Sequence, residues 1–315
     1  MVNDDGPPSR RDSPYIRPFV DALQDAGHRV SVVVPATSRS WIGKAHLIGA
    51  LLEASFVPPD AFRDDGSWET AVDPDPPTPI SIDSNGGQKP RPRTGREEET
   101  DWVVVRDGTP ASCTQLGLFN LFPERGRIDL VVSGPNHGHN TSTIYNLSSG
   151  TVGGALEAVT CGKRGIALSF GSKEEQDPEV VCAASRLAVR VIEHLCQNWD
   201  SGVELYNVNV PLRPDVERRS VRYARALPNV WTKGSLYAER PTLDPGEKDG
   251  PGGAAGPAKG YGWLSWIGST TEEPRRAPGR ERYFQWSTEL SDIQKSLESS
   301  EDGTDARTLR DGCTR

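Results

Sequence analysis

The chain has 315 residues, of which 35% are hydrophobic, and it carries a formal net charge of −8. This length is enough for one large domain or two small ones, and the negative charge argues against a partner such as duplex nucleic acid, whose backbone requires a basic surface. No run of 18 apolar residues exists, so we expect no membrane-spanning helix, and the polar N-terminus and five scattered cysteines favour a reduced, cytoplasmic protein.

The first expected elements are a helix and a strand, followed by a long insertion. One helical face is formed by four apolar residues at i, i+3, i+4 and i+7, namely Ile16, Phe19, Val20 and Leu23. Gly27 provides a stop signal, and the β-rich stretch 29–34 predicts a strand. From 57 to about 100 the periodicity disappears among proline, glycine and charged residues, which predicts a partly disordered loop insertion.

Strands and helices alternate after this insertion. Strands are predicted at 102–105, 128–132, 165–170 and 203–210, and helices at 109–122, after 150 and at 179–196. Two of these strands are short, continuous apolar runs, as is typical of strands buried on both faces of a parallel sheet. The alternation predicts an α/β fold, a three-layer, Rossmann-like and mainly parallel sheet with helices on both faces. In such sheets ligands bind beyond the carboxyl ends of the strands.

The periodic pattern decays beyond about residue 222. In the stretch 241–260, ten of the twenty residues are Gly or Pro, which predicts a linker or loop. We therefore divide the chain into a main domain at 1–230, which contains the insertion at 57–100, and a loop-rich C-terminal extension at 231–315. Aromatic residues after the linker suggest that the extension packs back onto the protein.

The N-terminal sequence Asn-Asp-Asp-Gly at 3–6 is the first candidate site. Two adjacent carboxylates offer oxygen ligands, which suit Mg²⁺, Mn²⁺ or Ca²⁺, and the glycine lets the backbone turn closely around an ion. By itself, however, such a tetrapeptide is more often a solvated acidic turn.

The sequence Ser-Gly-Pro-Asn-His-Gly-His-Asn at 133–140 directly follows a predicted buried strand. Asn136 could offer its carbonyl oxygen to a metal, and His137 and His139 could act as acid, base or ligand. The alternative is a glycine-rich turn with solvent-facing histidines. The position favours a site, because α/β sheets bind ligands at this end of their strands.

Two further segments could contact a phosphate or its metal. Residues 148–151, Ser-Ser-Gly-Thr, open a predicted helix, whose free N–H groups and positive dipole end form an anion site. By itself this pattern is more often a simple N-cap. In the segment 39–44, the Ser40 hydroxyl could bind a metal and Lys44 could meet phosphate, although the Walker pattern of a P-loop is absent.

Together, and in this order, these segments resemble the SurE survival-protein family. The resemblance rests on Asn-Asp-Asp-Gly at 3–6, Arg-Ser at 39–40, Asp-Gly-Thr-Pro-Ala-Ser-Cys at 107–113, Ser-Gly-Pro-Asn-His-Gly-His-Asn at 133–140, Ser-Gly-Thr-Val-Gly-Gly-Ala at 149–155 and Asn-Val-Asn-Val-Pro at 207–211. It extends from residue 1 to about 212. Ser-Trp-Ile-Gly-Lys-Ala-His at 40–46 and the long insertion resemble the fungal branch, often described as acid phosphatase or nucleotidase.

The resemblance implies a phosphomonoester hydrolase that uses Mg²⁺ or Mn²⁺, with nucleoside 5′- and 3′-monophosphates as the usual substrates. The implied metal ligands are Asp4, Asp5, Ser40 and Asn136. Of these, Asp4, Asp5 and Asn136 are also the expected catalytic residues, with a metal-activated water as nucleophile. The implied phosphate-binding residues are Asn3, Ser149, Gly150 and Thr151. The resemblance also implies a homodimer that involves the C-terminal extension.

An alternative hypothesis follows from two departures from the family. Only Met1 and Val2 precede the first motif, where the family has a full strand, and Cys313-Thr314-Arg315 replaces the family's closing strand after Gly303-Thr304-Asp305. The chain could then be a catalytically inactive SurE-like remnant that acts as a binding or interaction protein. A haloacid-dehalogenase-type phosphatase is disfavoured, because that class needs Asp-x-Asp where this chain has Asp-Asp-Gly.

Overall fold

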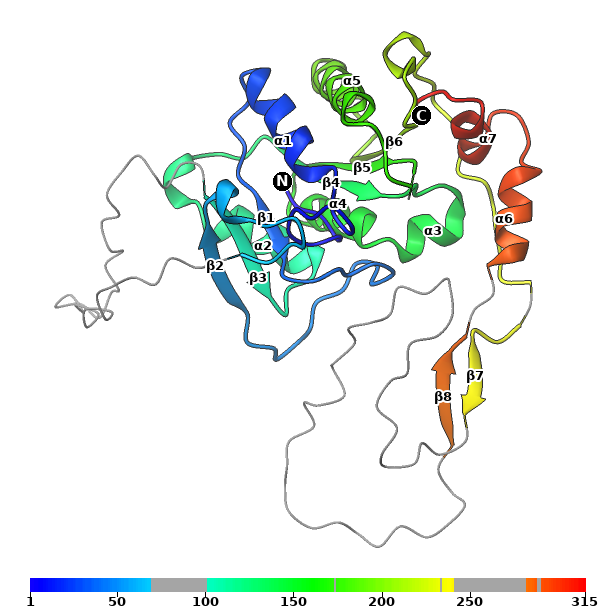
Figure 1. Cartoon of the computed structure of the whole chain (residues 1–315), viewed down its shortest axis with the longest axis horizontal. Coiled ribbons are helices and arrows are strands. Elements are labelled where there is room, and N and C mark those ends of the chain that lie inside the picture. The colour runs from blue at the N-terminus through cyan, green and yellow to red at the C-terminus, as the bar shows by residue number, and fades with distance from the viewer. Residues whose placement is uncertain (69–100, 173, 233, 241–281, 288–289) are drawn as a thin grey trace, which may run out of the picture.

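A computed structural model describes residues 1–68, 101–172, 174–232, 234–240, 282–287 and 290–315 (Figure 1). Six of its strands form two three-stranded groups with the orders β1-β3-β2 and β4-β5-β6. The first group consists of β1 (Val33–Pro35), β2 (Glu53–Val57) and β3 (Trp102–Arg106), and the second of β4 (Leu130–His137), β5 (Arg164–Phe170) and β6 (Leu205–Val210). All neighbours are parallel except β2, which runs antiparallel to β3 at the edge.

The first two residues of the chain join these two groups into one sheet. On one side, Val33 N donates to Met1 O at 2.9 Å. On the other side, Val2 N donates to Val132 O at 3.0 Å and Gly134 N donates to Val2 O at 2.8 Å. The central strand that the sequence led us to expect as nearly absent is thus reduced to two residues, but its main-chain groups are paired on both sides beside the first motif.

Helices cover both faces of the sheet, which confirms the predicted three-layer α/β fold (Figure 1). On one face, α1 (Ile16–Asp25) and α5 (Pro178–Gln197) enclose a core with Phe19, Ile166 and Leu168. On the other face, α2 (Pro110–Phe119) and α4 (Gly150–Thr160) enclose a second core with Val2, Val103 and Ala158. The amphipathic face predicted for the first helix is buried, with Ile16, Phe19, Val20 and Leu23 all inside.

Several elements differ from the sequence-based expectation. Strand β1 is shorter than the predicted 29–34, and the edge strand β2 was not predicted. Strand β4 continues to His137, five residues past the predicted end, with a register shift between Ser133 and Asn136. A short helix that was not predicted, α3 (Ser142–Ser148), lies between the strand predicted at 128–132 and the helix predicted after 150. The polar motif at 133–140 therefore lies largely on a strand.

The remaining elements lie in short turns and in the C-terminal extension. They are the 3₁₀ turns η1 (Pro59–Ala61), η2 (Pro123–Arg125) and η3 (Val216–Arg218), the hairpin strands β7 (Tyr237–Arg240) and β8 (Tyr283–Trp286), and the helices α6 (Ser291–Glu298) and α7 (Asp305–Arg310). The predicted linker at 241–260 and most of the insertion, at 69–100, lie outside the described residues. The proposed domain boundary near 230 stays a prediction.

Among the helices that the structure describes, none combines the length and the apolar character needed to cross a bilayer.

Candidate functional site

The motif at 3–6 forms a tight turn at the carboxyl end of the two-residue central strand. The Asn3 side chain is fully buried and closes this turn, because its Nδ2 donates to Gly6 O at 2.8 Å and its Oδ1 accepts from Gly6 N at 3.2 Å. Gly6 has a φ of +95°, in the left-handed region that favours glycine. Asn3 therefore shapes the turn that presents the two carboxylates, and its role toward phosphate stays a prediction.

The Asp4 carboxylate lies beneath the start of α4 and is only 2% exposed. The Thr151 hydroxyl donates to Asp4 Oδ1 at 2.5 Å, and Arg39 N donates to Asp4 O at 2.6 Å. At Gly150, an added Cβ would lie 2.8 Å from the Asp4 Cβ and 2.9 Å from Arg39 O. Three segments that are far apart in the sequence thus converge on Asp4, and the fit requires a glycine at position 150.

Burial raises the pKa of Asp4 to about 6, although hydrogen bonds from the Thr151 hydroxyl and from backbone N–H groups of Gly150 and Thr151 oppose this shift. Within the described part of the chain, no Lys, Arg or His forms an ion pair with this carboxylate. A buried carboxylate without a cationic partner is costly in its charged form. A bound divalent ion would supply the missing positive charge, so Asp4 fits the role of a metal ligand.

Asp5 connects the N-terminal turn to the end of β4. Its Oδ2 accepts a hydrogen bond from His137 N at 2.7 Å, and the side chain is almost fully buried. Asn136 is the residue before His137 on β4. Its side-chain Nδ2 donates to Gly138 O at 2.8 Å, which leaves its Oδ1 as the atom suited to a cation. The structure therefore brings Asp4, Asp5 and Asn136 to the same edge of the sheet.

Ser40 belongs to a loop that lies over the start of α4. Its hydroxyl is 3.2 Å from Ser38 Oγ, and Gly43 N donates to Ser148 O at 2.9 Å. Because Arg39 contacts the main chain of Asp4, the neighbouring Ser40 lies beside the carboxylate turn, as the resemblance implied. Whether its hydroxyl binds a metal stays a prediction.

Glu157 on α4 holds the other end of this loop. Its Oε2 lies 2.6 Å from Lys44 Nζ and 3.2 Å from His46 Nε2, and Gln115 donates to its Oε1 at 2.6 Å. Burial alone would raise the pKa of Glu157, but the hydrogen bonds from Lys44, Gln115 and His46 outweigh it and lower the pKa to about 2. Lys44 is thus engaged with Glu157 rather than directed toward a phosphate.

The start of α4 combines a cap with a contact to the site. Ser149 is the N-cap, because its Oγ accepts from Val152 N at 3.1 Å. The next two residues direct their N–H groups at the Asp4 carboxylate. In this structure the positive end of the helix therefore stabilises the charge of Asp4, and the predicted binding of phosphate by Ser149, Gly150 and Thr151 remains untested.

An aromatic cluster beside Ser40 was not identified as part of the site from the sequence. The Trp41 ring centroid lies 5.5 Å from that of Tyr145, 6.3 Å from that of Trp231 and 6.1 Å from that of Trp286. His139 contacts Tyr145 with a centroid distance of 5.8 Å. The one signal in the sequence was the group of aromatic residues after the linker, and Trp286 does pack back onto the main domain.

Asp305 is a second residue that sequence reasoning did not assign to the site. It is fully buried on α7, accepts from Ser142 N at 2.7 Å and from Leu227 N at 2.9 Å, and pairs with Arg315 Nη1 at 3.3 Å. These contacts brace the chain just after the motif at 133–140. The C-terminal segment thereby supports the loop that follows Asn136.

The donor set determines which ion would fit. Among the described residues there is no group of three or more His, Cys, Asp or Glu side chains that could hold a metal ion by itself. The candidate site has two carboxylates, and the remaining oxygens would come from the Asn136 amide and the Ser40 hydroxyl. Such an all-oxygen set with few carboxylates suits Mg²⁺ or Mn²⁺ better than Zn²⁺, which prefers histidine and cysteine.

Comparison with known proteins gives consistent matches. The family model described as "Survival protein SurE" matches residues 1–233. The "Probable tubulin--tyrosine ligase PBY1" of Saccharomyces cerevisiae is 38% identical over 241 residues, which are 73% of this chain but only 31% of that protein. A "5'-nucleotidase SurE" of Nitratidesulfovibrio vulgaris is 30% identical over 233 residues, 73% of each chain, and one of Archaeoglobus fulgidus is 29% identical over 242 residues, 75% of each.

Among solved structures, the SurE protein from Aquifex aeolicus aligns with a TM-score of 0.57 and 22% identity. The alignment covers 99% of this chain and 89% of that one. At this level of identity the likeness concerns the fold.

Proposed function

The chain belongs to the SurE survival-protein family, and from this premise we propose that it is a divalent-metal-dependent phosphomonoester hydrolase, a 5′/3′-nucleotidase or acid phosphatase. The observation that carries the proposal is the environment of Asp4. This carboxylate is buried at the carboxyl edge of a parallel sheet, held by Thr151 and without an ion pair among the described residues. Its burial without a cationic partner among the described residues supports a role for Asp4 as a metal ligand.

Asp4, Asp5, Asn136 and Ser40 would hold the ion, Mg²⁺ or Mn²⁺. When bound, it supplies Lewis-acid polarisation of the phosphate and lowers the pKa of a bound water. The protein's own contribution is positioning. Thr151 orients Asp4, and the His137 N–H orients Asp5, so both carboxylates are restrained before any substrate arrives.

The substrate that we propose is a nucleoside monophosphate. Two of the relatives are named 5′-nucleotidases, and the cluster of Trp41, Tyr145 and Trp231 offers aromatic faces beside Ser40 on which a planar base can stack. The start of α4, from Ser149 to Thr151, together with Asn3 would bind the phosphate. The ligase name of the yeast relative is not carried over, because the similarity covers only 31% of that protein.

The proposal is tested with the purified chain, AMP and p-nitrophenyl phosphate. We expect phosphate release with Mg²⁺ or Mn²⁺ and none in EDTA. Asp4→Ala and Asp5→Ala should each abolish activity, whereas Asp129→Asn, which alters a carboxylate that is 91% exposed, should leave it unchanged. Full activity of both site variants would show that the reaction occurs elsewhere.

The competing hypothesis of an inactive remnant predicts a different result. If the ion does not bind, the melting temperature will be the same with and without Mn²⁺, since a ligand that binds only the native state must stabilise it. The main-chain groups of Met1 and Val2 are hydrogen-bonded to the strands on both sides, which supports the motif at 3–6 and argues against an inactive remnant. The homodimer and the cytoplasmic location stay predictions, to be checked by light scattering and by imaging of the tagged protein.

A further inference from the structure

Asp305, the first residue of α7, is a fully buried carboxylate that the proposed hydrolysis does not use. Its Oδ2 accepts from Ser142 N at 2.7 Å, and its Oδ1 accepts from Leu227 N at 2.9 Å. Oδ1 also accepts from Ala306 N at 2.7 Å, and Oδ2 lies 3.3 Å from Arg315 Nη1. Such charge-assisted bonds to main-chain N–H groups are stronger than neutral ones. The carboxylate therefore joins two segments that are distant in the sequence.

Each of these two segments leads directly to a ring of the aromatic cluster in the candidate site. Ser142 is the first residue of α3, which carries Tyr145 one turn later. Leu227 precedes Trp231 by four residues. The ring centroids of Tyr145 and Trp231 lie 5.5 and 6.3 Å from that of Trp41. The buried carboxylate thus connects the starts of the two segments whose rings meet on Trp41.

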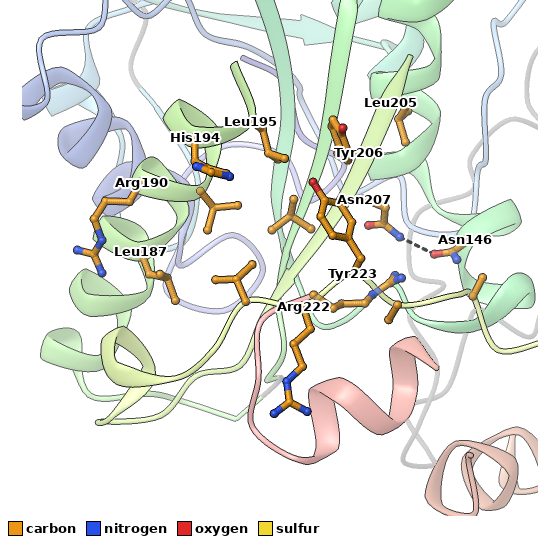
Figure 2. A pocket seen from close by; sticks show the side chains of 16 residues that line it. Asn146, Leu187, Arg190, His194, Leu195, Leu205, Tyr206, Asn207, Arg222 and Tyr223 are labelled. Carbon is orange, nitrogen blue, oxygen red and sulfur yellow. Dashed lines mark hydrogen bonds between the residues drawn. The ribbon is translucent and has the colours of Figure 1, made fainter. Parts of the chain in front are cut away.

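Further contacts hold the same two segments in parallel with the carboxylate. Thr143 N donates to Leu227 O at 3.0 Å, and the Thr143 hydroxyl donates to Asn229 O at 3.0 Å and accepts from Asn229 N at 2.8 Å. Farther along α3, Asn146 Oδ1 accepts from Asn207 Nδ2 of β6 at 2.8 Å, as Figure 2 shows. Loss of the carboxylate should therefore shift the two segments relative to each other without separating them.

The main chain of Ser142 depends on the carboxylate most directly. Its φ is +70°, in the left-handed region that residues with a Cβ rarely adopt. Among the described residues, none forms a hydrogen bond with the buried Ser142 hydroxyl, so its side chain does not stabilise this conformation. The bond from Ser142 N to Asp305 offsets the strain instead. Without it, the start of α3 should relax to another conformation and move the ring of Tyr145.

We propose that Asp305 is a positioning residue, which sets the places of Tyr145 and Trp231 against Trp41 and thereby determines the affinity for the base of a nucleoside monophosphate. The inference rests on the proposed function, because it takes the aromatic cluster as the place where the base stacks. Within the described chain, the contacts of Asp305 include none of the proposed metal ligands. Binding of the phosphate part should therefore not depend on it.

The test compares AMP with ribose 5-phosphate, which has the same sugar and phosphate but no base, by measuring kcat and KM with Mn²⁺. For Asp305→Asn we expect KM for AMP to rise about tenfold, in line with the loss of one stacking contact. Its kcat and both constants for ribose 5-phosphate should stay within about twofold of the parent. An equal rise of KM for both substrates, or no rise for AMP, would overturn the proposal.

Asp302→Asn is the matched control, because it alters a carboxylate that is 90% exposed just before α7. It should change neither constant for either substrate. A rise of KM for AMP as large as in Asp305→Asn would overturn the proposal, since an exposed carboxylate has no contact with the two segments.

Ser142→Gly distinguishes positioning from a general loss of stability. Glycine adopts a φ of +70° without strain, so the start of α3 can keep its conformation without the carboxylate. We expect Ser142→Gly alone to keep the KM of the parent for AMP, and the double variant with Asp305→Asn to recover most of the tenfold loss. A double variant no better than Asp305→Asn would contradict the role given to this bond.

Binding measured by isothermal titration calorimetry in EDTA does not require hydrolysis. A parent chain that releases no phosphate, but binds AMP more tightly than ribose 5-phosphate and loses this preference in Asp305→Asn, would refute the proposed hydrolysis and support the present inference. A parent chain without any preference for AMP in KM or in binding would overturn the inference, even if phosphate is released.

A second variant covers the case that Asp305→Asn does not fold, which thermal melting reveals. Thr143→Val removes the hydroxyl that links α3 to Asn229 and leaves the carboxylate in place. Because it loosens the same two segments, it should raise KM for AMP several-fold and leave KM for ribose 5-phosphate unchanged. Unchanged KM for AMP in a folded Thr143→Val chain would then overturn the proposal.

Discussion

The hydroxyl of Thr151 donates a hydrogen bond to Oδ1 of Asp4 across 2.5 Å, joining two residues that are 147 positions apart. This contact connects the N-terminal turn to the first turn of α4. It stabilises the charged form of a carboxylate whose burial favours the protonated form. If Asp4 binds a metal ion as proposed, the strength of that binding should therefore depend on Thr151.

Thr151→Val removes this donor while keeping a branched side chain of similar size. Without it, the charged form of Asp4 is less favourable, so we expect the Mn²⁺ concentration for half-maximal AMP hydrolysis to rise about ten- to a hundredfold. Thr151→Ser keeps a hydroxyl and should stay within a few-fold of the parent. Equal Mn²⁺ dependence of the valine and serine variants would contradict the role given to this bond.

Asp4 should make the metal-free protein less stable as the pH rises. Its pKa is about 6 in the folded state, against an ordinary value of 3.8 for an aspartate in the unfolded chain, so the folded protein binds more protons between these values. This contribution to the free energy of unfolding is fully present below pH 3.8 and is lost as the pH rises through 6, by at most about 3 kcal/mol.

Urea unfolding in EDTA between pH 4 and 7 measures this effect as the difference between the parent and Asp4→Asn, which cannot ionise. We expect the parent to lose stability relative to the variant over this range. Saturating Mn²⁺ at pH 7 should restore the stability of the parent only. Parallel pH curves for the two proteins in EDTA would contradict the burial of a titrating carboxyl.

Glu157→Gln should loosen the loop that carries Ser40. The folded-state pKa of Glu157 is about 2, well below its usual 4.5, so its contribution is present above pH 4.5 and is lost as the pH falls toward 2. At neutral pH the substitution should cost up to about 3 kcal/mol of stability, because Lys44 loses its partner. Thermal melting at pH 7 measures this loss of stability. Glu124→Gln, at an exposed position in a turn, is the matched control and should not change the melting temperature.

The Glu157→Gln variant also distinguishes a role of Glu157 in stability from a role in metal activation. If the ion pair of Glu157 with Lys44 positions Ser40, then Glu157→Gln should also weaken Mn²⁺ activation at a temperature where it is fully folded. Unchanged activation would confine Glu157 to a role in stability.

Trp41 should lower the KM of substrates that contain a nucleobase and not the KM of substrates that lack one. Trp41→Leu removes the aromatic face beside Ser40, and we expect KM for AMP to rise about tenfold, in line with the loss of one stacking contact. The KM for glycerol phosphate, which has no ring, should stay unchanged, as should both values in Phe119→Leu, an exposed aromatic residue on α2. An equal rise for both substrates would place Trp41 in general positioning of the phosphate.

The elements that sequence patterns predicted well are those with a strong internal signal. The face of α1 and the apolar runs of β4 and β5 followed directly from residue spacing. Strand β2 was missed because Glu53–Val57 has mostly polar or partly exposed positions, and only its pairing with β3 makes it a strand. Helix α3 was missed because its seven residues carry too few apolar positions to show a period.

Motif order within the sequence was sufficient to identify the family and to name Asp4, Asp5, Ser40 and Asn136 as candidates. It did not show that Asp4 is buried, that Thr151 holds it, or that Trp41 and Trp286 meet beside the site. Local sequence determines which side chains are available and how the backbone turns. The pKa of a carboxyl depends on the desolvation and the donors around it, and these come from segments that only the folded sheet and its helices bring together.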